Sequence, residues 1–159
     1  MILLVIVIVV VLLALIYLGL SYFIAYMAVH QNRQPVLKNP EDYGMKFEDI
    51  EFKADDGVKI KGWLIPGELN KVIVMTHVAG LTKYGSITGY KNPTKMYNRE
   101  IEFLKTAQHL HQAGYWVLLF DFRNHGESGP DPNKGIAGIG LKEYQDVVAA
   151  LGFISRRDD

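Results

Sequence analysis

GYWVLLFDFRNHGESG, residues 114–129, is the stretch of sequence that decides the expected fold. Its first half contains a nearly continuous apolar run at 115–122, which is typical of a strand buried on both faces of a sheet. Its second half is polar and rich in glycine, which indicates a turn. This turn also places His125 three residues ahead of Ser128. The question is whether these two residues are a catalytic base and its nucleophile or only part of the scaffold.

The segments on either side predict alternating strands and helices. Upstream, KVIVMTH at 71–77 is a second apolar run of the buried-strand kind. The region 97–114 then has apolar residues at helical spacing and ends at Gly114, a residue type that often follows a helix. Downstream, 141–154 predicts a helix with one side formed by Leu141, Tyr144, Val148 and Leu151. This order of elements predicts a parallel sheet with helices on its faces.

Two shorter segments ahead of these predict an antiparallel hairpin. Apolar and polar residues alternate over 47–54 and again over 58–65, as expected of half-buried strands. The residues DDG at 55–57 separate them, and Asp-Gly is a strong hairpin signal. The expected fold class is therefore α/β, with an antiparallel hairpin followed by a parallel βαβα unit.

The first 29 residues differ from the rest of the chain. No charged or strongly polar residue lies between Ile2 and Leu20, and the apolar character continues to Val29. This length is enough for a helix to cross a bilayer, and in lipid only a helix satisfies its own backbone. The expected organisation is a transmembrane helix at 1–29 that contacts the lipid bilayer through 2–29, a linker at 30–45 and an α/β domain at 46–159.

A cleaved secretory signal is the alternative to a membrane anchor. It is disfavoured because no Lys or Arg precedes the long apolar stretch, and because Tyr26 would occupy the −3 position before Ala28. Basic residues instead follow the segment, at Arg33, Lys38 and Lys46. The positive-inside tendency therefore predicts a single-pass membrane protein whose soluble part is cytoplasmic.

Composition excludes several classes of function. Among 159 residues, 17 Lys and Arg balance 17 Asp and Glu, so neither nucleic acid nor an acidic partner is implied. There are no cysteines, which excludes disulfides and thiolate metal sites. His109 and His111 lie two residues apart on a predicted helix and point to different faces, so they make a poor metal pair. No cofactor and no metal ion is expected.

Two glycine-rich segments share only part of a nucleotide-binding pattern. GLTKYGS at 80–86 has the glycine spacing of a P-loop, but Ser86 follows Gly85 directly and Lys83 is misplaced. GIAGIG at 135–140 follows a long polar loop rather than the first strand of a unit. Both segments are therefore expected to be ordinary loops.

Ser128 is a poor candidate for a nucleophile. A nucleophile elbow reads G-x-S-x-G, whereas Pro130 stands where the second glycine is required and no helix signal follows. Asp121, directly after the buried strand, is expected to hold the following loop in place, with Arg123 as its ion-pair partner.

Three segments together resemble the N-terminal half of the α/β-hydrolase superfamily: THVAG at 76–80, QAGYWVLLFDFRNHGESG at 112–129 and GLKEYQDVVAAL at 140–151. The resemblance spans roughly 40–154 and is closest to bacterial serine hydrolases related to serine aminopeptidases, monoglyceride lipases and membrane-anchored esterase-like proteins. It implies hydrolysis of a small ester or amide substrate through an acyl-serine intermediate, without a cofactor.

The resemblance also implies an oxyanion hole in the loop after the first buried strand. Backbone N–H groups of this loop stabilise the negative oxygen of a tetrahedral intermediate. By position, the donors are Val78 and Ala79, with His77 and Gly80 as adjacent residues of the motif. Val78 stands where the family has glycine, and its β-branched side chain restricts the backbone there.

In the family, the FRNHGESG loop is structural, so Ser128 and His125 are implied to be scaffold. The triad runs in the order Ser, Asp or Glu, His, and its serine elbow follows the helix that is predicted here at 141–154. No catalytic residue is therefore expected within the 159 residues, which are expected to form an inactive hydrolase fragment. The alternative is a non-catalytic, membrane-anchored interaction module derived from a hydrolase half-domain.

Overall fold

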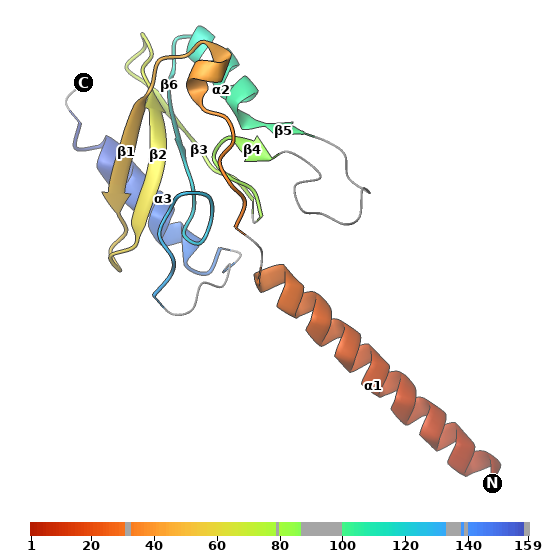
Figure 1. The fold of residues 1–159 in the computed structure, drawn as a ribbon. Coiled ribbons are helices and arrows are strands. Elements are labelled where there is room, and N and C mark those ends of the chain that lie inside the picture. Colours follow the sequence, from red (N-terminus) through yellow and green to blue (C-terminus); the bar gives the residue numbers. More distant parts are fainter. Residues whose placement is uncertain (31–32, 79, 87–99, 133–137, 139, 158–159) are drawn as a thin grey trace.

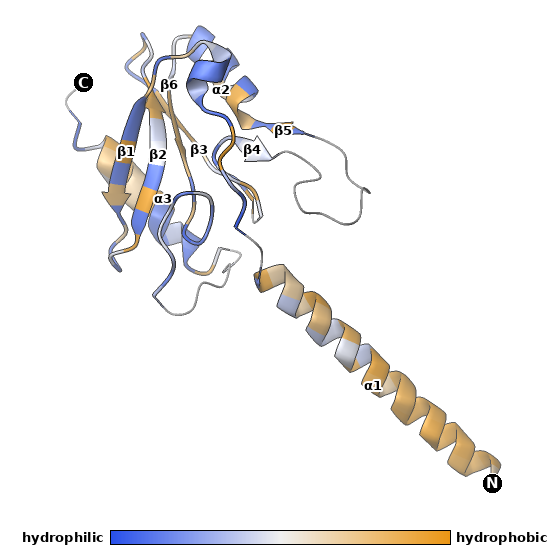
Figure 2. Ribbon diagram, in the orientation of Figure 1, coloured by the Kyte–Doolittle hydropathy of each residue, from blue (hydrophilic) through white to orange (hydrophobic). Residues whose placement is uncertain are grey.

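The structure, a computed structural model, consists of one long helix and a small α/β domain (Figure 1). It describes residues 1–30, 33–78, 80–86, 100–132, 138 and 140–157. The long helix, α1 (Ile2–Val29), extends away from the domain. Figure 2 shows that α1 is apolar along almost all of its length.

A four-stranded mixed sheet forms the centre of the domain. Its strands lie in the order β1 (Glu48–Lys53), β2 (Lys59–Ile65), β6 (Trp116–Phe120) and β3 (Val72–Met75). β1 pairs antiparallel with β2, and β2 antiparallel with β6, whereas β3 runs parallel to β6. The predicted hairpin and the predicted parallel pair are both confirmed.

The central strand β6 has a hydrophobic core on each of its faces. Leu118 packs in one core with Ala150 of α3, and Val117 packs in the other core with Ala107 of α2. Successive strand residues point to opposite faces of a sheet, so the two helices cover opposite faces. The helices of the domain are η1 (Pro40–Tyr43), α2 (Phe103–Gln112) and α3 (Glu143–Ile154).

The predicted helix at 97–114 begins later than expected. Ile101 and Glu102 form strand β5 (Ile101–Glu102), which pairs with β4 (Gly85–Ser86). Gly85 has a φ of +117°, and a Cβ there would lie 1.7 Å from the Ile101 carbonyl oxygen. Because this close pairing holds 101–102 extended, α2 starts only at Phe103; residues 97–99 lie outside the described part of the chain.

The predicted linker at 30–45 is partly folded. The Asn39 side chain accepts a hydrogen bond from the Glu41 amide, and the Asp42 carboxylate accepts one from the Asn39 amide, both at 2.8 Å. This capping box starts η1. Met45 is buried and packs against the core between the sheet and α2. The packed domain therefore begins ahead of residue 46, earlier than the sequence predicts.

The apolar side predicted for the last helix faces outward. Leu141 lies just ahead of α3 and is 81% exposed, and Tyr144, Val148 and Leu151 on α3 are each more than half exposed. The buried face of α3 contains Ala150 together with two carboxylates. Within the described residues, β3 pairs only with β6 and so forms an edge of the sheet. The domain thus presents an apolar helix stripe and an open strand edge.

The apolar N-terminal helix is confirmed as a helix. None of its 28 residues is buried, and its most apolar window has a mean hydropathy of 3.4. It is the single helix among the described residues that is long and apolar enough to cross a membrane. Length and composition of this kind fit both a membrane anchor and a signal sequence.

We predict that Gly85→Ala lowers the free energy of unfolding more than Gly57→Ala does. Both glycines have positive φ, where other residues cost about 1–2 kcal/mol. A Cβ on Gly57 meets nothing within 4 Å, whereas one on Gly85 meets the backbone of β5. Urea unfolding followed by Trp63 and Trp116 fluorescence should show an additional loss of about 2 kcal/mol or more for Gly85→Ala. Equal losses would contradict the β4–β5 pairing.

Candidate functional site

The candidate site lies where two loops meet at the carboxyl ends of the parallel strands β3 and β6. One loop follows β3 and includes His77, Val78 and Gly80; the other follows β6 and spans 121–129. In open α/β sheets, ligands bind outside the carboxyl ends of the strands. Ala79, the second predicted oxyanion donor, lies outside the described residues.

Two buried histidines link these loops reciprocally. His77, from the first loop, accepts a hydrogen bond at Nε2 from the Phe122 amide of the second loop at 3.1 Å. His125, from the second loop, accepts one at Nε2 from the Gly80 amide of the first loop, also at 3.1 Å. The two rings contact each other edge to face, with centroids 5.1 Å apart. Each loop is therefore held by a side chain of the other.

These contacts determine the tautomer of both rings. A backbone N–H can only donate, so each Nε2 is unprotonated and each Nδ1 carries the hydrogen. His77 Nδ1 donates to the Val78 carbonyl at 2.9 Å, and His125 Nδ1 donates to the Arg123 carbonyl at 2.8 Å. Burial, the largest influence, lowers the pKa of His77 and favours its neutral form. Neither ring has a nitrogen left to act as a base toward Ser128.

Ser128 is engaged in the scaffold. It is fully buried, and its Oγ donates to the Asp121 carbonyl at 2.5 Å and accepts from the Lys61 amide of β2 at 3.0 Å. The bond to Lys61 fixes the loop after β6 to the neighbouring strand, and the bond to Asp121 closes the loop on itself. The geometry agrees with the interpretation of Ser128 and His125 as scaffold rather than as nucleophile and base.

Asp121 holds its loop in place, as predicted, but its ion-pair partner is Lys83. The Asp121 carboxylate accepts from the Lys83 amide at 2.7 Å and from the Glu127 amide at 3.0 Å. Lys83 Nζ lies 2.9 Å from Asp121 Oδ2 and 4.5 Å from the centre of the Trp63 ring. The predicted pair between Asp121 and Arg123 is therefore wrong. Lys83 is also buried, which agrees with the expectation that 80–86 is not a phosphate-binding loop.

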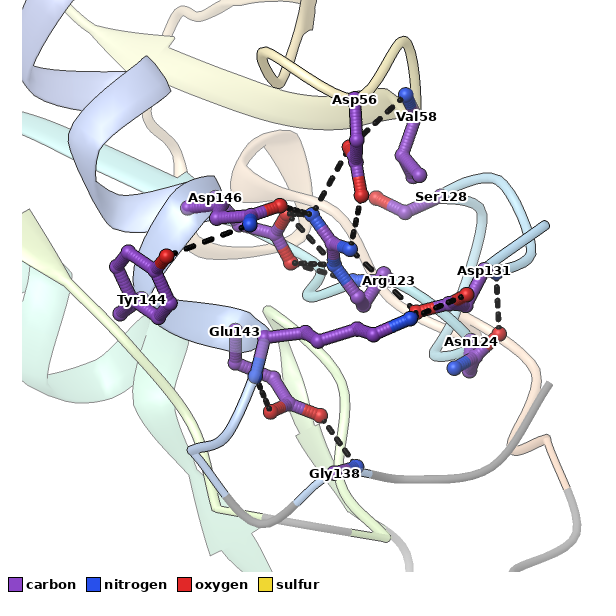
Figure 3. A network of polar contacts seen from close by, with 12 residues as sticks. Asp56, Val58, Arg123, Asn124, Ser128, Asp131, Gly138, Glu143, Tyr144 and Asp146 are labelled. Carbon is purple, nitrogen blue, oxygen red and sulfur yellow. Dashed lines mark hydrogen bonds and ion pairs between the residues drawn. The ribbon is translucent and has the colours of Figure 1, made fainter. Parts of the chain in front are cut away.

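Arg123 points instead into a cluster of carboxylates (Figure 3). Its Nε and Nη2 donate to Asp146 Oδ1 at 3.0 and 2.8 Å, and its Nη1 donates to Asp56 at 2.6 Å. Burial lowers the pKa of Arg123, but the hydrogen bonds to Asp146 and Asp56 outweigh it and raise the pKa above its usual value. The hydrogen bond between Arg123 and Asp56 in turn lowers the pKa of Asp56. This cluster joins the β1–β2 turn, the loop after β6 and α3.

Glu143 fixes the start of α3. Its carboxylate accepts hydrogen bonds from the Gly138 and Gly140 amides at 2.6 and 2.8 Å. Burial raises the pKa of Glu143, but the backbone donors together outweigh it and hold the pKa below its usual value. The described glycines of the 135–140 segment thus bind a carboxylate of the protein itself, as an ordinary loop would.

Val78 is an exposed residue of the loop after β3. It is 68% exposed, and no described residue accepts a hydrogen bond from its amide. The Gly80 amide, in contrast, is bound to His125. Of the described N–H groups of this loop after His77, the one at Val78 is therefore the one without an acceptor among the described residues, and its predicted oxyanion role stays a prediction.

The described residues offer no metal site, and a hollow among them reaches only one of the two loops. They contain no group of three or more His, Asp or Glu that could hold a metal ion. A hollow of about 260 Å³ touches the loop after β6 through Glu127, and the rest of its lining consists of Val36, Leu37, Lys38, Asn39, Phe47, Asp49 and Trp63. No described residue of the loop after β3 lines this hollow.

A solved structure identifies the architecture. The esterase Pf2001 of Pyrococcus furiosus matches with a TM-score of 0.65 and 25% sequence identity, over 81% of this chain and 44% of that chain. The chain carries part of an α/β-hydrolase fold. A second crystal form of the same esterase gives a TM-score of 0.66 at 24% identity.

Two curated fungal proteins are similar to about 70% of the chain. The polyketide transferase af380 of Aspergillus fumigatus is 33% identical over 113 residues, which are 70% of this chain and 32% of that protein. The thiohydrolase aneE of Aspergillus aculeatus is 30% identical over 112 residues, which are 70% of this chain and 30% of that protein. No protein-family model matches the chain. The chain spans about a third of the length of the curated relatives it matches.

We predict that Ser128→Ala destabilises the hydrolase domain. The substitution removes the buried Ser128 hydroxyl and leaves the Lys61 amide without its acceptor, a loss of about 1–3 kcal/mol. The control is Ser155→Ala, because Ser155 is exposed and bonds only within its own helix end; it should change stability by less than about 0.5 kcal/mol. Denaturant unfolding of both variants checks this, and equal stability of Ser128→Ala and the parent would show that the buried hydroxyl is dispensable.

Proposed function

We propose that these 159 residues form the N-terminal scaffold of a membrane-anchored serine hydrolase of the serine aminopeptidase and monoglyceride-lipase-like group. The complete enzyme hydrolyses an ester or amide through an acyl-serine intermediate, without a metal or organic cofactor. The observation that carries this proposal is the Val78 amide in the loop after β3, which donates to no described residue, in a fold that superposes on an esterase.

Val78 and Ala79 are the proposed oxyanion donors. Backbone donors contribute to acyl transfer when they point at the position where negative charge develops. The Gly80 amide is already bound to His125, which favours the two residues ahead of it. The β-branched side chain of Val78 narrows the backbone conformations of this loop, so the hole has a different shape from one built on glycine.

The proposed substrate is a small acyl compound. Esters and amides follow from the serine-hydrolase resemblance, and we add thioesters because one relative is a thiohydrolase. All three react through the same tetrahedral intermediate, whose negative oxygen the loop after β3 would stabilise.

The 159 residues alone are proposed to be inactive. Ser128 is buried and both of its hydrogen-bonding directions are used. In this fold, the nucleophile and its partners come from elements that follow the helix at α3. The open edge of β3 and the apolar stripe of α3 are surfaces on which such elements would pack.

A non-catalytic interaction module is the second candidate, and the same exposed stripe and strand edge favour it. Open strand edges are ready sites for pairing with another chain. The coding sequence beyond the codon for Asp159 distinguishes the two. An in-frame strand, G-x-S-x-G and later Asp and His support the hydrolase, whereas an immediate stop codon supports the module.

α1 is proposed to be a single-pass anchor with the domain on the cytoplasmic side. Its 28 residues are predominantly apolar and reach across a bilayer core, and Arg33, Lys38 and Lys46 follow it.

We predict that the purified 159-residue chain is not labelled by a fluorophosphonate probe and does not hydrolyse short acyl esters. The physical reason is that the histidine nearest to Ser128 in sequence has no free ring nitrogen. The Pyrococcus furiosus esterase serves as the positive control. Labelling of the parent chain that Ser128→Ala abolishes would refute the assignment of Ser128 to the scaffold.

We also predict that the expressed chain fractionates with membranes and resists salt and carbonate washing. An apolar helix of this length partitions into lipid rather than binding by charge. Variants of the same chain without residues 2–29 should be found in the soluble fraction. Release of a soluble protein shortened near Ala28 would overturn the anchor in favour of a signal peptide.

A further inference from the structure

The pair of histidines at the candidate site forms a closed set of contacts that we call the histidine clasp. It consists of His77 and His125, together with the Phe122 and Gly80 amides that donate hydrogen bonds to them. Both rings are buried, with 6% exposure each. All four of their ring nitrogens are used, two as acceptors between the loops and two as donors within a loop.

We propose that His77 and His125 are positioning residues that hold the candidate oxyanion loop in place only while both rings are neutral. Uptake of a proton by either ring releases the loop from the loop after β6. The Val78 amide, which lies between His77 and Gly80 in sequence, then loses its fixed direction.

The reason is the direction of the hydrogen bonds. A protonated imidazole carries hydrogens on both nitrogens and accepts none. Its Nε2–H would then face the backbone N–H that it previously accepted, so one bond is lost and two donors oppose each other. The pair also carries a like-charge penalty if both rings are protonated, because their centroids are only 5.1 Å apart.

The charged groups that face the clasp have opposing effects on the pKa of His77. Asp121, at the end of β6, favours the protonated form of His77, whereas Lys83 and His125 disfavour it. Lys83 and Asp121 form a buried ion pair, and Glu127 binds the same ammonium, so these charges largely compensate each other near the rings. Burial is the largest influence and lowers the pKa of His77.

The sign of the pH dependence follows from this direction. Because the pKa of His77 is lower in the folded chain, the unfolded or opened chain binds the proton more tightly. The clasp is therefore fully formed above about pH 6.5, the usual value for histidine, and weakens as the pH falls through the lowered pKa.

The histidine clasp is defined by contacts in the structure. Only the oxyanion role of the loop that it holds rests on the proposed function. Its test accordingly involves no hydrolysis. Failure of the clasp would show in backbone exchange, whereas failure of the proposed function would show in the coding sequence and the probe experiment.

The experiment measures hydrogen exchange of single amides by NMR on the full 159-residue chain in detergent, at about pH 7.5 and about pH 5. The reporters are the Gly80 and Phe122 amides, and the reference is the Leu118 amide in β6. After correction for intrinsic exchange, we expect the reporters to lose protection at least about tenfold relative to Leu118 at the lower pH. At the higher pH, ring ¹⁵N spectra should show both histidines with the hydrogen on Nδ1.

Matched variants separate the clasp from a general effect of acid. Glutamine places an acceptor oxygen near the position of Nε2 without titrating, so the double variant His77→Gln with His125→Gln should keep both reporters protected at both pH values. His125→Phe should leave Gly80 unprotected at both. His109→Gln, on the exposed surface of α2, should keep the parent's pH dependence.

Three results would overturn the proposal. The reporters in the parent chain could keep their protection at about pH 5. The ring spectra, which need no variant, could show hydrogen on Nε2 at the higher pH. The double glutamine variant, if folded, could retain the parent's pH dependence, which would place the titrating group elsewhere.

Discussion

The burial of four polar side chains in one loop is the constraint on which the rest of the domain depends. Asp121, Arg123, His125 and Ser128 all lie in the segment after β6 and are 6% exposed or less. A buried polar group without a partner costs about 1–3 kcal/mol, and a charged one costs more. Each of the four therefore requires a partner from another element. Those partners are Lys83, Asp146 with Asp56, the Gly80 amide and the Lys61 amide.

This requirement explains why the loops at the candidate site have one arrangement. A buried ion pair adds little net stability compared with an apolar pair, but loss of one partner costs several kcal/mol. The Arg123 cluster and the Lys83 pair therefore favour one arrangement of the loops over others, and they add little to the net stability of that arrangement. Gly126 belongs to the same constraint, because a Cβ there would lie 2.2 Å from an Asp121 carboxylate oxygen. The loop closes tightly around that carboxylate because residue 126 has no side chain.

The elements predicted correctly are those whose signal is local. The apolar run of β6 and the Asp-Gly turn at 55–57 each carry their information within a few residues. The capping box at Asn39 and Asp42 is also local and was available in the sequence, but two nearby prolines led to a linker prediction instead.

The polar partnerships could not be predicted because nothing local encodes them. Asp121 binds a lysine 38 residues earlier, and Arg123 binds an aspartate 23 residues later. Closeness in sequence favoured a pair between Asp121 and Arg123. In the fold, Asp121 pairs with Lys83, and Arg123 joins the cluster of carboxylates. In α3, apolar residues occur on both sides, so periodicity alone could not show that the side with Asp146 faces the sheet. The prediction for Val78 came from the resemblance, whereas each contact of the histidine clasp between the loops joins residues 45 positions apart and has no local signal.

The early start of the folded domain also limits how far it can travel from α1. Val36 already packs beside the cluster of Trp63, Tyr84 and Leu104, so only the six positions 30–35 separate it in sequence from the end of α1 at Val29. Fully extended, a segment of that length spans about 20 Å. With α1 inserted in a bilayer, the domain would be confined to a thin layer next to the lipid headgroups. A domain restricted in this way would meet molecules that diffuse in the plane of the membrane far more often than those in bulk solution.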